Sequence, residues 1–316
     1  MNRKPQLFFF WLIFVIGLTM TGCWSSDRES RSGNYGKIDP VSSPSSSPNL
    51  SSSNRNDNMA NKTGSESDIK TGGFYANLPG GFNRPTDEVG SRLLKEYGSV
   101  FVARGGVTPP TTVVFRDDNA VSAFQAGLSK SSDTIGGVTI ELQAPAMKAL
   151  KEAVAEASQN GVSITPRGND AARRVYADTI ELWKSRVGPG LEHWSAKGRI
   201  SAADVQRIKS LSPYDQVPEI FKLESQGMYF SKDLSKPIIY SVAPPGSSQH
   251  LSMLALDVSE YDNPKVRDIL ARHGWYQTVL SDLPHFTYLG VSENDLAKLG
   301  LKKVTDGGRT FWVPDI

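Results

Sequence analysis

Residues 24–72 constrain the fold more than any other feature, because they hold too few apolar side chains to build a core. The stretch consists mainly of Ser, Asn, Pro and Gly with scattered charges, as in VSSPSSSPNLSSSNRNDN. Such a sequence cannot bury enough apolar surface to offset the entropy lost when a chain is ordered. We therefore expect residues 23–72 to be a disordered Ser-rich tether and residues 73–316 to be the folded domain.

The first 22 residues have the pattern of a secretion signal. Arg3 and Lys4 precede an apolar run over 7–18, which is shorter than the roughly 20 residues that span a bilayer. The small residues before Cys23 resemble the cleavage box of bacterial lipoproteins, and the alternatives are an uncleaved anchor or an ordinary signal peptide. The resemblance implies a protein held at a bacterial membrane by a lipid on Cys23, in the cell envelope and facing the periplasm or the exterior.

The cysteine count excludes a fold held by disulfides, and the net charge does not indicate a polyanionic partner. Cys23 is the only cysteine of the 316 residues, so an intrachain disulfide is impossible. The formal net charge is +2 and includes Arg3 and Lys4, so it falls to 0 when the signal is removed (2 − 2 = 0). A neutral chain gives no indication of nucleic acid or an anionic membrane surface as a partner. We expect a monomer.

Apolar spacing predicts an α+β fold. A helix is expected between Met147 and Ala157, and further helices are expected to start at Asn169 or Asp170, at Ser201 with Asp204, and at Asn263. Strands are expected at 162–165, at 254–258 and after His285, and residues 212–238 should be loop-rich. The irregular order and the short strands near the end favour a small, mostly antiparallel sheet with flanking helices over a doubly wound parallel sheet.

Residues 74–131 form an N-terminal extension whose role the sequence leaves open. The runs SVFVARGG at 99–106 and TTVVF at 111–115 favour short strands, and AVSAFQAGL at 120–128 favours a helix. No motif in this segment points to chemistry.

Two of the four histidines lie in a pattern that suits a metal. His250 directly precedes the expected strand that carries Asp257, and His285 follows Asp282 by three residues. Zinc catalysis uses three protein ligands with N or O atoms and leaves one position open for water. His250, Asp257 and His285 meet that need, and Asp282 is the local candidate for the carboxylate that shuttles the proton. The structural alternatives are a loop cap for His250, a buried strand-end carboxylate for Asp257 and a turn residue for Asp282.

The other two histidines indicate structural roles. His273 lies in the last turn of an expected helix, where an imidazolium interacts favourably with the helix dipole. His193 is expected in a surface loop.

Three segments resemble motifs of the zinc D-Ala-D-Ala carboxypeptidases, the VanX- and VanY-like peptidoglycan peptidases. SSQHLSMLALD is similar to Ser-x-His-x-x-Gly-x-Ala-x-Asp, DLPHFTYLG to the closing Glu-Pro-Trp-His-Phe motif, and SITPRG to Ser-Gly-Tyr-Arg-Ser. The resemblance spans roughly 142–290 and keeps the order Arg, His, Asp, acid, His. It implies a fold like that of hedgehog proteins and D-Ala-D-Ala peptidases.

The same resemblance implies roles for individual residues. His250, Asp257 and His285 would bind Zn²⁺, and Asp282 would act as the catalytic base in place of Glu. Arg167 would bind a substrate carboxylate, which suits the donor fork of a guanidinium, and Ser248 would hydrogen-bond the substrate. The alternatives are an exposed charge after a turn for Arg167 and a loop cap for Ser248.

Two departures from the family pattern bear on activity. Met253 stands where the motif has Gly, so we expect no positive φ there. Asp282 stands where the motif has Glu, as in the related L-alanyl-D-glutamate endopeptidases. The function implied is a zinc metallopeptidase that hydrolyses peptidoglycan stem peptides in the manner of a D-Ala-D-Ala carboxypeptidase. The alternatives are an endopeptidase of the L-alanyl-D-glutamate type and a non-catalytic zinc-containing module that binds the cell wall, as hedgehog-like relatives suggest.

Overall fold

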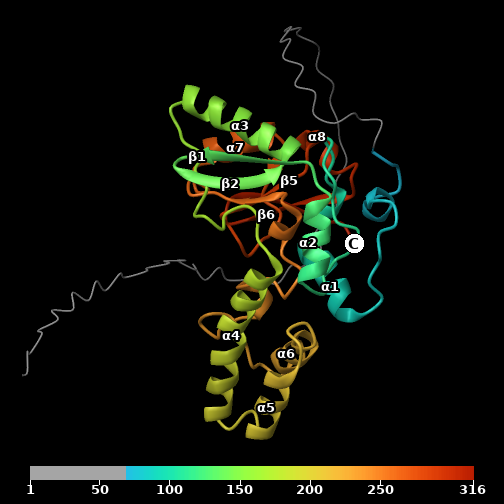
Figure 1. The fold of residues 1–316 in the computed structure, drawn as a ribbon, viewed down its shortest axis with the longest axis vertical. Helices are drawn as coiled ribbons and strands as arrows, with labels where there is room; N and C mark the ends of the chain where they lie inside the picture. Colours follow the sequence, from blue (N-terminus) through green and yellow to red (C-terminus); the bar gives the residue numbers. More distant parts are fainter. Residues whose placement is uncertain (1–68) are drawn as a thin grey trace, which may run out of the picture. The chain divides into compact units, whose positions relative to one another are not determined.

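The computed structural model describes residues 69–316, which belong to one compact unit. The expected signal at 1–22, the expected lipid attachment at Cys23 and nearly all of the expected tether at 23–72 lie outside the described residues. Within them, helices are mixed with small antiparallel sheets (Figure 1). None of the helices between residues 69 and 316 has the length and apolar character needed to cross a membrane.

A small three-stranded sheet lies at the centre of the main core. Its order is β3 (Ala255–Asp257), β5 (His285–Tyr288) and β4 (Trp275–Tyr276), and both pairings are antiparallel. Every residue of the three strands is buried. This arrangement agrees with the expected α+β class and with strands near 254–258 and 285–288.

The helix α3 (Ala144–Gln159) confirms the helix expected from Met147 to Ala157. It buries Ala146, Met147, Leu150, Ala153 and Ala157, which recur at the spacing of one helical face. The helix packs against the hairpin of β1 (Lys130–Ile135) and β2 (Val138–Gln143) and against α7 (Pro264–Arg272) (Figure 1). The helix α7 begins at the expected Asn263 cap, whose side chain accepts a hydrogen bond from the backbone of Lys265.

The N-terminal segment is built into the main core. It contains η2 (Phe74–Asn77), α1 (Glu88–Tyr97), η3 (Gly98–Val102) and α2 (Asp118–Ala126). The helix expected at 120–128 is therefore confirmed, but the strand expected at 99–106 is a 3-10 turn, and the run at 111–115 makes only an isolated bridge between Asn83 and Thr112. A short apolar run indicates burial, and burial alone does not separate a strand from a helical turn.

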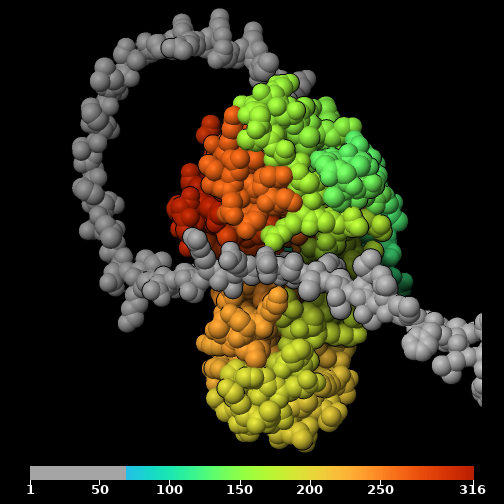
Figure 2. Space-filling view, turned by 90° about the vertical axis from the view of Figure 1, so that its left-hand side faces the viewer, coloured from blue at the N-terminus to red at the C-terminus, as the bar shows by residue number. Residues whose placement is uncertain are grey.

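Three helices share a second hydrophobic core. They are α4 (Tyr176–Ala196), α5 (Ala202–Ser210) and α6 (Gln216–Ser225), and they pack around Trp183, Ile208 and Ile220 (Figure 1). Figure 2 shows their side chains, in yellow, as one continuous surface.

Several expectations for this region were wrong. The helix α4 starts at Tyr176, because the Asp178 carboxylate caps the backbone N–H of Val175 at 2.7 Å, and Asn169 and Asp170 cap nothing there. His193 lies inside α4 rather than in a loop. The region at 212–238 contains α6 and is otherwise mostly loop, as expected. The cap between Ser201 and Asp204 is confirmed.

The C-terminal part closes the core. It consists of the short helix α8 (Glu293–Leu296) and the hairpin of β6 (Leu301–Asp306) and β7 (Arg309–Pro314). The strand β7 packs on α1 and η3, and the Ser99 hydroxyl donates to the carbonyl of Trp312 at 2.8 Å. His273 caps the C-terminus of α7 and pairs with Glu156 at 2.7 Å, in agreement with a structural role.

Candidate metal centre

The strand register brings two of the expected ligands together. Asp257 on β3 pairs directly with His285 on β5, and directly paired residues of antiparallel strands project from the same face of the sheet. His250 lies in the 3-10 turn η5 (Gln249–Ser252), which leads into β3. The structure therefore brings together His250, Asp257 and His285, and all three are buried.

The three ligand atoms form a nearly equilateral triangle. Nε2 of His250 lies 3.4 Å from Oδ1 of Asp257 and 3.2 Å from Nδ1 of His285. The distance from Nδ1 of His285 to Oδ1 of Asp257 is 3.3 Å. Ligand atoms of a tetrahedral zinc site with bonds of about 2.0–2.1 Å lie roughly 3.3–3.4 Å apart. The triangle thus has the dimensions of one face of such a site.

Hydrogen bonds outside the triangle determine which nitrogen of each imidazole carries the proton. Nδ1 of His250 lies 2.7 Å from the carbonyl oxygen of Ala172, which can only accept. Nε2 of His285 lies 2.9 Å from Oε1 of Gln249, which can also only accept. In its neutral form, each imidazole therefore donates outward and turns an unprotonated nitrogen towards the centre, as metal-binding histidines do.

The charges suit a bound cation. Burial, and then the nearby Arg174 guanidinium, lower the pKa of His250, so this imidazole is neutral at pH 7. The Arg174 guanidinium also donates to Oδ2 of Asp257 at 3.0 Å, which favours the ionised carboxylate. Oδ1 of Asp257 is buried and has no hydrogen-bond partner.

Three lone pairs therefore face one another without a proton between them. Buried polar atoms in folded proteins are nearly always paired, so an orphaned carboxylate oxygen beside two unprotonated nitrogens indicates a site that a cation completes. Two imidazoles and one carboxylate are also the donor set of a catalytic zinc site. The residues present fit a zinc ion.

Arg174 is a site residue that the sequence did not reveal. Its guanidinium donates to Oδ2 of Asp257 at 3.0 Å and is largely buried, and its Nε donates to the carbonyl of Asp170 at 3.1 Å. The bond to Oδ2 leaves the other carboxylate oxygen, Oδ1, to face the imidazoles. No sequence signal separates Arg174 from its exposed neighbour Arg173, because the contact depends on the tertiary path of residues 166–174 beside β3.

Arg167 reaches the centre through its backbone. Its N–H donates to the carbonyl of Asp257 at 2.9 Å, and its neighbour Pro166 forms an isolated bridge with Val258. The strand expected at 162–165 does not form, and the bridge at Pro166 lies directly after it. The Arg167 side chain is exposed, with its guanidinium 5.6 Å from the ring centroid of Tyr261. No residue of the triangle binds it.

Ser248 and Asp282 flank the ligands in sequence and are half-buried. Ser248 occupies the N-cap position of η5, but its side chain makes no capping hydrogen bond, so the alternative of a side-chain cap does not hold. Asp282 accepts a hydrogen bond from the backbone of His285 at 3.1 Å through its carbonyl. Its carboxylate makes no hydrogen bond or ion pair with any residue from 69 to 316, and it does not belong to the three-ligand group.

The expectation for Met253 was wrong. Its φ is 58° and its ψ is 29°, which is the left-handed conformation that a Gly would adopt without strain. A non-Gly residue in this region costs about 1–2 kcal/mol. The side chain of Met253 is fully buried, and burial of a side chain of this size contributes about 1.5–3 kcal/mol, which offsets the cost.

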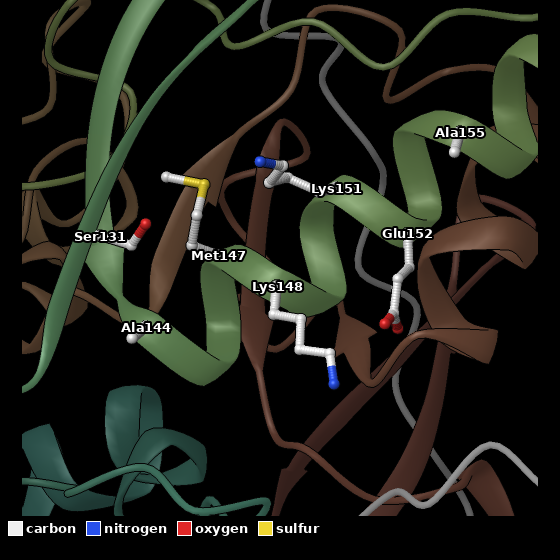
Figure 3. Close-up of a pocket in the computed structure, with 7 residues that line it drawn as sticks. All are labelled: Ser131, Ala144, Met147, Lys148, Lys151, Glu152 and Ala155. Carbon is white, nitrogen blue, oxygen red and sulfur yellow. The ribbon is translucent and has the colours of Figure 1, made fainter.

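A separate depression lies along α3 (Figure 3). Its lining comes from β1 and α3: Ser131, Ala144, Met147, Lys148, Lys151, Glu152 and Ala155. Lys151 is already paired with Asp133 at 2.6 Å. None of the lining residues belongs to the metal centre.

The sequence matches no protein-family model and no curated protein. Among solved structures, the chain is similar to the D,D-pentapeptidase VanY of the VanB-type vancomycin resistance cassette, in a mutant form in complex with Zn(II). The match covers 52% of this chain and 82% of that one, at 16% sequence identity and a TM-score of 0.28. The likeness is a weak similarity at the level of the fold.

Proposed function

We propose that the chain is a zinc metallopeptidase that hydrolyses peptidoglycan stem peptides, with His250, Asp257 and His285 as zinc ligands. The observation that carries this proposal is the triangle formed by Nε2 of His250, Nδ1 of His285 and Oδ1 of Asp257, whose corners lie 3.2–3.4 Å apart. The Oδ1 corner is buried and has no hydrogen-bond partner. The order of the three family-like motifs in the sequence supports the peptidase class.

A zinc ion held by these residues would supply Lewis acidity to the scissile carbonyl and make water a better nucleophile at neutral pH. The Asp282 carboxylate, which has no partner among residues 69–316, would accept a proton from the attacking water. It would then return that proton to the leaving amine nitrogen. The uncommitted hydroxyl of Ser248 would donate a hydrogen bond to the substrate.

Carboxypeptidase activity is the leading form of this proposal. The backbone of Arg167 is hydrogen-bonded to the carbonyl of Asp257, and its guanidinium is exposed. An exposed guanidinium can bind a free C-terminal carboxylate through two parallel hydrogen bonds. An endopeptidase of the L-alanyl-D-glutamate type is the second candidate, and the Asp-x-Pro-His form of the base segment favours it.

Mass spectrometry of muropeptides would test the function. The full chain, kept soluble in detergent, is incubated with purified peptidoglycan, and an Asp282→Ala variant is treated in the same way in a parallel reaction. Loss of one terminal alanine identifies a carboxypeptidase, and release of the stem at L-Ala identifies an endopeptidase. If the wild type holds zinc but releases no product, the domain is a non-catalytic module; a wild type without zinc refutes both zinc functions.

The N-terminal residues support a proposal for the site of action. A lipid on Cys23 would hold the chain at a bacterial membrane, and residues 23–72 would give the domain reach to the cell wall. Incorporation of a clickable palmitate analogue into the wild type, absent in Cys23→Ser, would support this attachment. Equal labelling of both proteins would exclude it.

A further inference from the structure

Gln249 connects the metal centre to the N-terminal segment. Its side chain is 4% exposed and contacts four groups, one of which is the hydroxyl of Thr278, 3.4 Å from both Nε2 and Oε1. Oε1 accepts from Nε2 of His285 at 2.9 Å and from the hydroxyl of Thr287. Nε2 donates to the main-chain carbonyl of Tyr97 at 2.8 Å, and Tyr97 is the last residue of α1.

The Tyr97 carbonyl fixes the orientation of the Gln249 amide. A carbonyl oxygen can only accept, so the NH₂ group of Gln249 must face Tyr97 and its oxygen must face His285. The reverse orientation would place two oxygens 2.8 Å apart in a buried site, where unpaired polar groups are costly.

The amide orientation in turn fixes the tautomer of His285. Because Oε1 of Gln249 cannot donate, Nε2 of His285 must carry the proton, and Nδ1 is left free to bind a metal. The remaining protons agree with this assignment. Thr278 and Thr287 lie 2.6 Å apart, and Thr287 donates its own proton to Oε1, so Thr278 donates to Thr287.

We propose that Gln249 is a positioning residue that holds His285 in the metal-binding tautomer and transmits the position of α1 to the metal centre. The proposal rests on the proposed role of His285 as a zinc ligand. It also gives the segment 74–131 a function, because this segment supplies the carbonyl that orients the amide. Tyr97 is itself held firmly: it is buried, and its hydroxyl donates to the carbonyl of Ile239 at 2.9 Å.

The tautomers can be observed directly in the metal-free protein. The chain has four histidines, so labelling with ¹⁵N-histidine and recording long-range ¹H–¹⁵N correlations gives four imidazoles. Substituting His193 and His273 by Gln, one at a time, removes the two histidines outside the centre. At pH 8 the other two should show opposite tautomers, with the proton on Nδ1 of His250 and on Nε2 of His285. If both carry the proton on Nδ1, the proposal is wrong.

Two variants of Gln249 test separately the acceptor role of its Oε1 towards His285 and the donor role of its Nε2 towards Tyr97. Gln249→Met keeps the volume but removes the acceptor, so His285 should lose its single tautomer and zinc affinity should fall about 10- to 100-fold, as for other groups that orient metal ligands. Gln249→Glu keeps an acceptor towards His285 but loses the donor to Tyr97, so the tautomer should survive while the folded state is destabilised. Zinc affinity is measured by competition with a chromophoric chelator.

Gln143→Met is the matched control. Gln143 is also buried, and among residues 69–316 its side chain bonds to the backbone of Thr108 and Ser252 and to no imidazole. Its loss should lower stability as much as Gln249→Met while leaving the His285 tautomer and zinc affinity unchanged. Equal zinc loss in both variants, or an unchanged tautomer in Gln249→Met, would overturn the proposal. A chain with the expected tautomers but no peptidase activity would instead refute the proposed function alone.

Discussion

Glu224 should make the stability of the protein fall as the pH rises towards neutrality. Its side chain is 6% exposed among the residues of the second core. One oxygen, Oε1, accepts from the backbone N–H of Ile238 at 2.6 Å, and the other, Oε2, is buried without a partner. Burial raises the pKa of Glu224 from 4.5 to about 7, against smaller opposing effects of the Ile238 N–H and the Arg92 charge.

The sign and the size follow from proton linkage. Between pH 4.5 and 7 the folded chain keeps a proton on Glu224 that the unfolded chain has lost, so the free energy of unfolding decreases as the pH rises. A difference of about 2.5 pKa units corresponds to about 3 kcal/mol, present in full below pH 4.5 and lost once the pH exceeds about 7. Gln cannot ionise, so Glu224→Gln should be more stable than the wild type at pH 8 by up to about 3 kcal/mol relative to their difference at pH 4.5.

Urea unfolding at several pH values gives the free energy of unfolding of the wild type and of Glu224→Gln. The contributions of all other titrating groups cancel in the difference between the two values. Glu219→Gln on the same helix is the control. A hydrogen bond from Arg207 lowers the pKa of Glu219, so the interaction stabilises the fold above the unfolded pKa and is lost as the pH falls. Its removal should therefore lower stability at pH 8. A pH-independent difference between wild type and Glu224→Gln would refute the reasoning.

Three further substitutions test the metal centre. Arg174→Gln weakens the contact that holds Oδ2 of Asp257, so zinc affinity measured by chelator competition should fall about 10- to 100-fold. Met253→Gly should be more stable to urea than Met253→Ala by about 1 kcal/mol, although Ala keeps more apolar surface, because φ is 58° at this position. Asp282→Asn should lower the rate of stem-peptide hydrolysis by about 10²- to 10⁴-fold in muropeptide assays while leaving zinc affinity unchanged, because Asp282 lies outside the three-ligand group.

The grouping of His250, Asp257 and His285 was predictable partly from their spacing and mainly from the resemblance of three segments to known motifs. Asp257 and His285 lie on adjacent short strands, and His250 precedes the first strand by a single turn, so pattern and strand pairing bring them together. The helices α3 and α7 were predictable from their apolar spacing and caps, which are local signals.

The contacts that orient the ligands were not predictable in this way. Arg174 and Gln249 act through the carboxylate of Asp257 and the backbone of Tyr97, which lie 83 and 152 residues away along the chain. The conformation of Met253 was mispredicted for a related reason. Local preference argues against positive φ in a side chain of this size, but the folded core buries the Met253 side chain and so stabilises an unfavourable backbone.

These long-range contacts already orient the three side chains of the metal centre, so a metal could bind with little rearrangement of them. The Ala172 carbonyl sets the tautomer of His250, Gln249 sets that of His285, and Arg174 orients Asp257. The partners come from chain segments that meet only in the folded state, so an unfolded chain offers no preformed centre. Zinc should therefore bind the folded chain selectively and stabilise all of these segments together, by about 2.7 kcal/mol at a free zinc concentration 100 times the dissociation constant. Loss of the α1 contact at Tyr97 should weaken that stabilisation, although Tyr97 itself contributes no ligand.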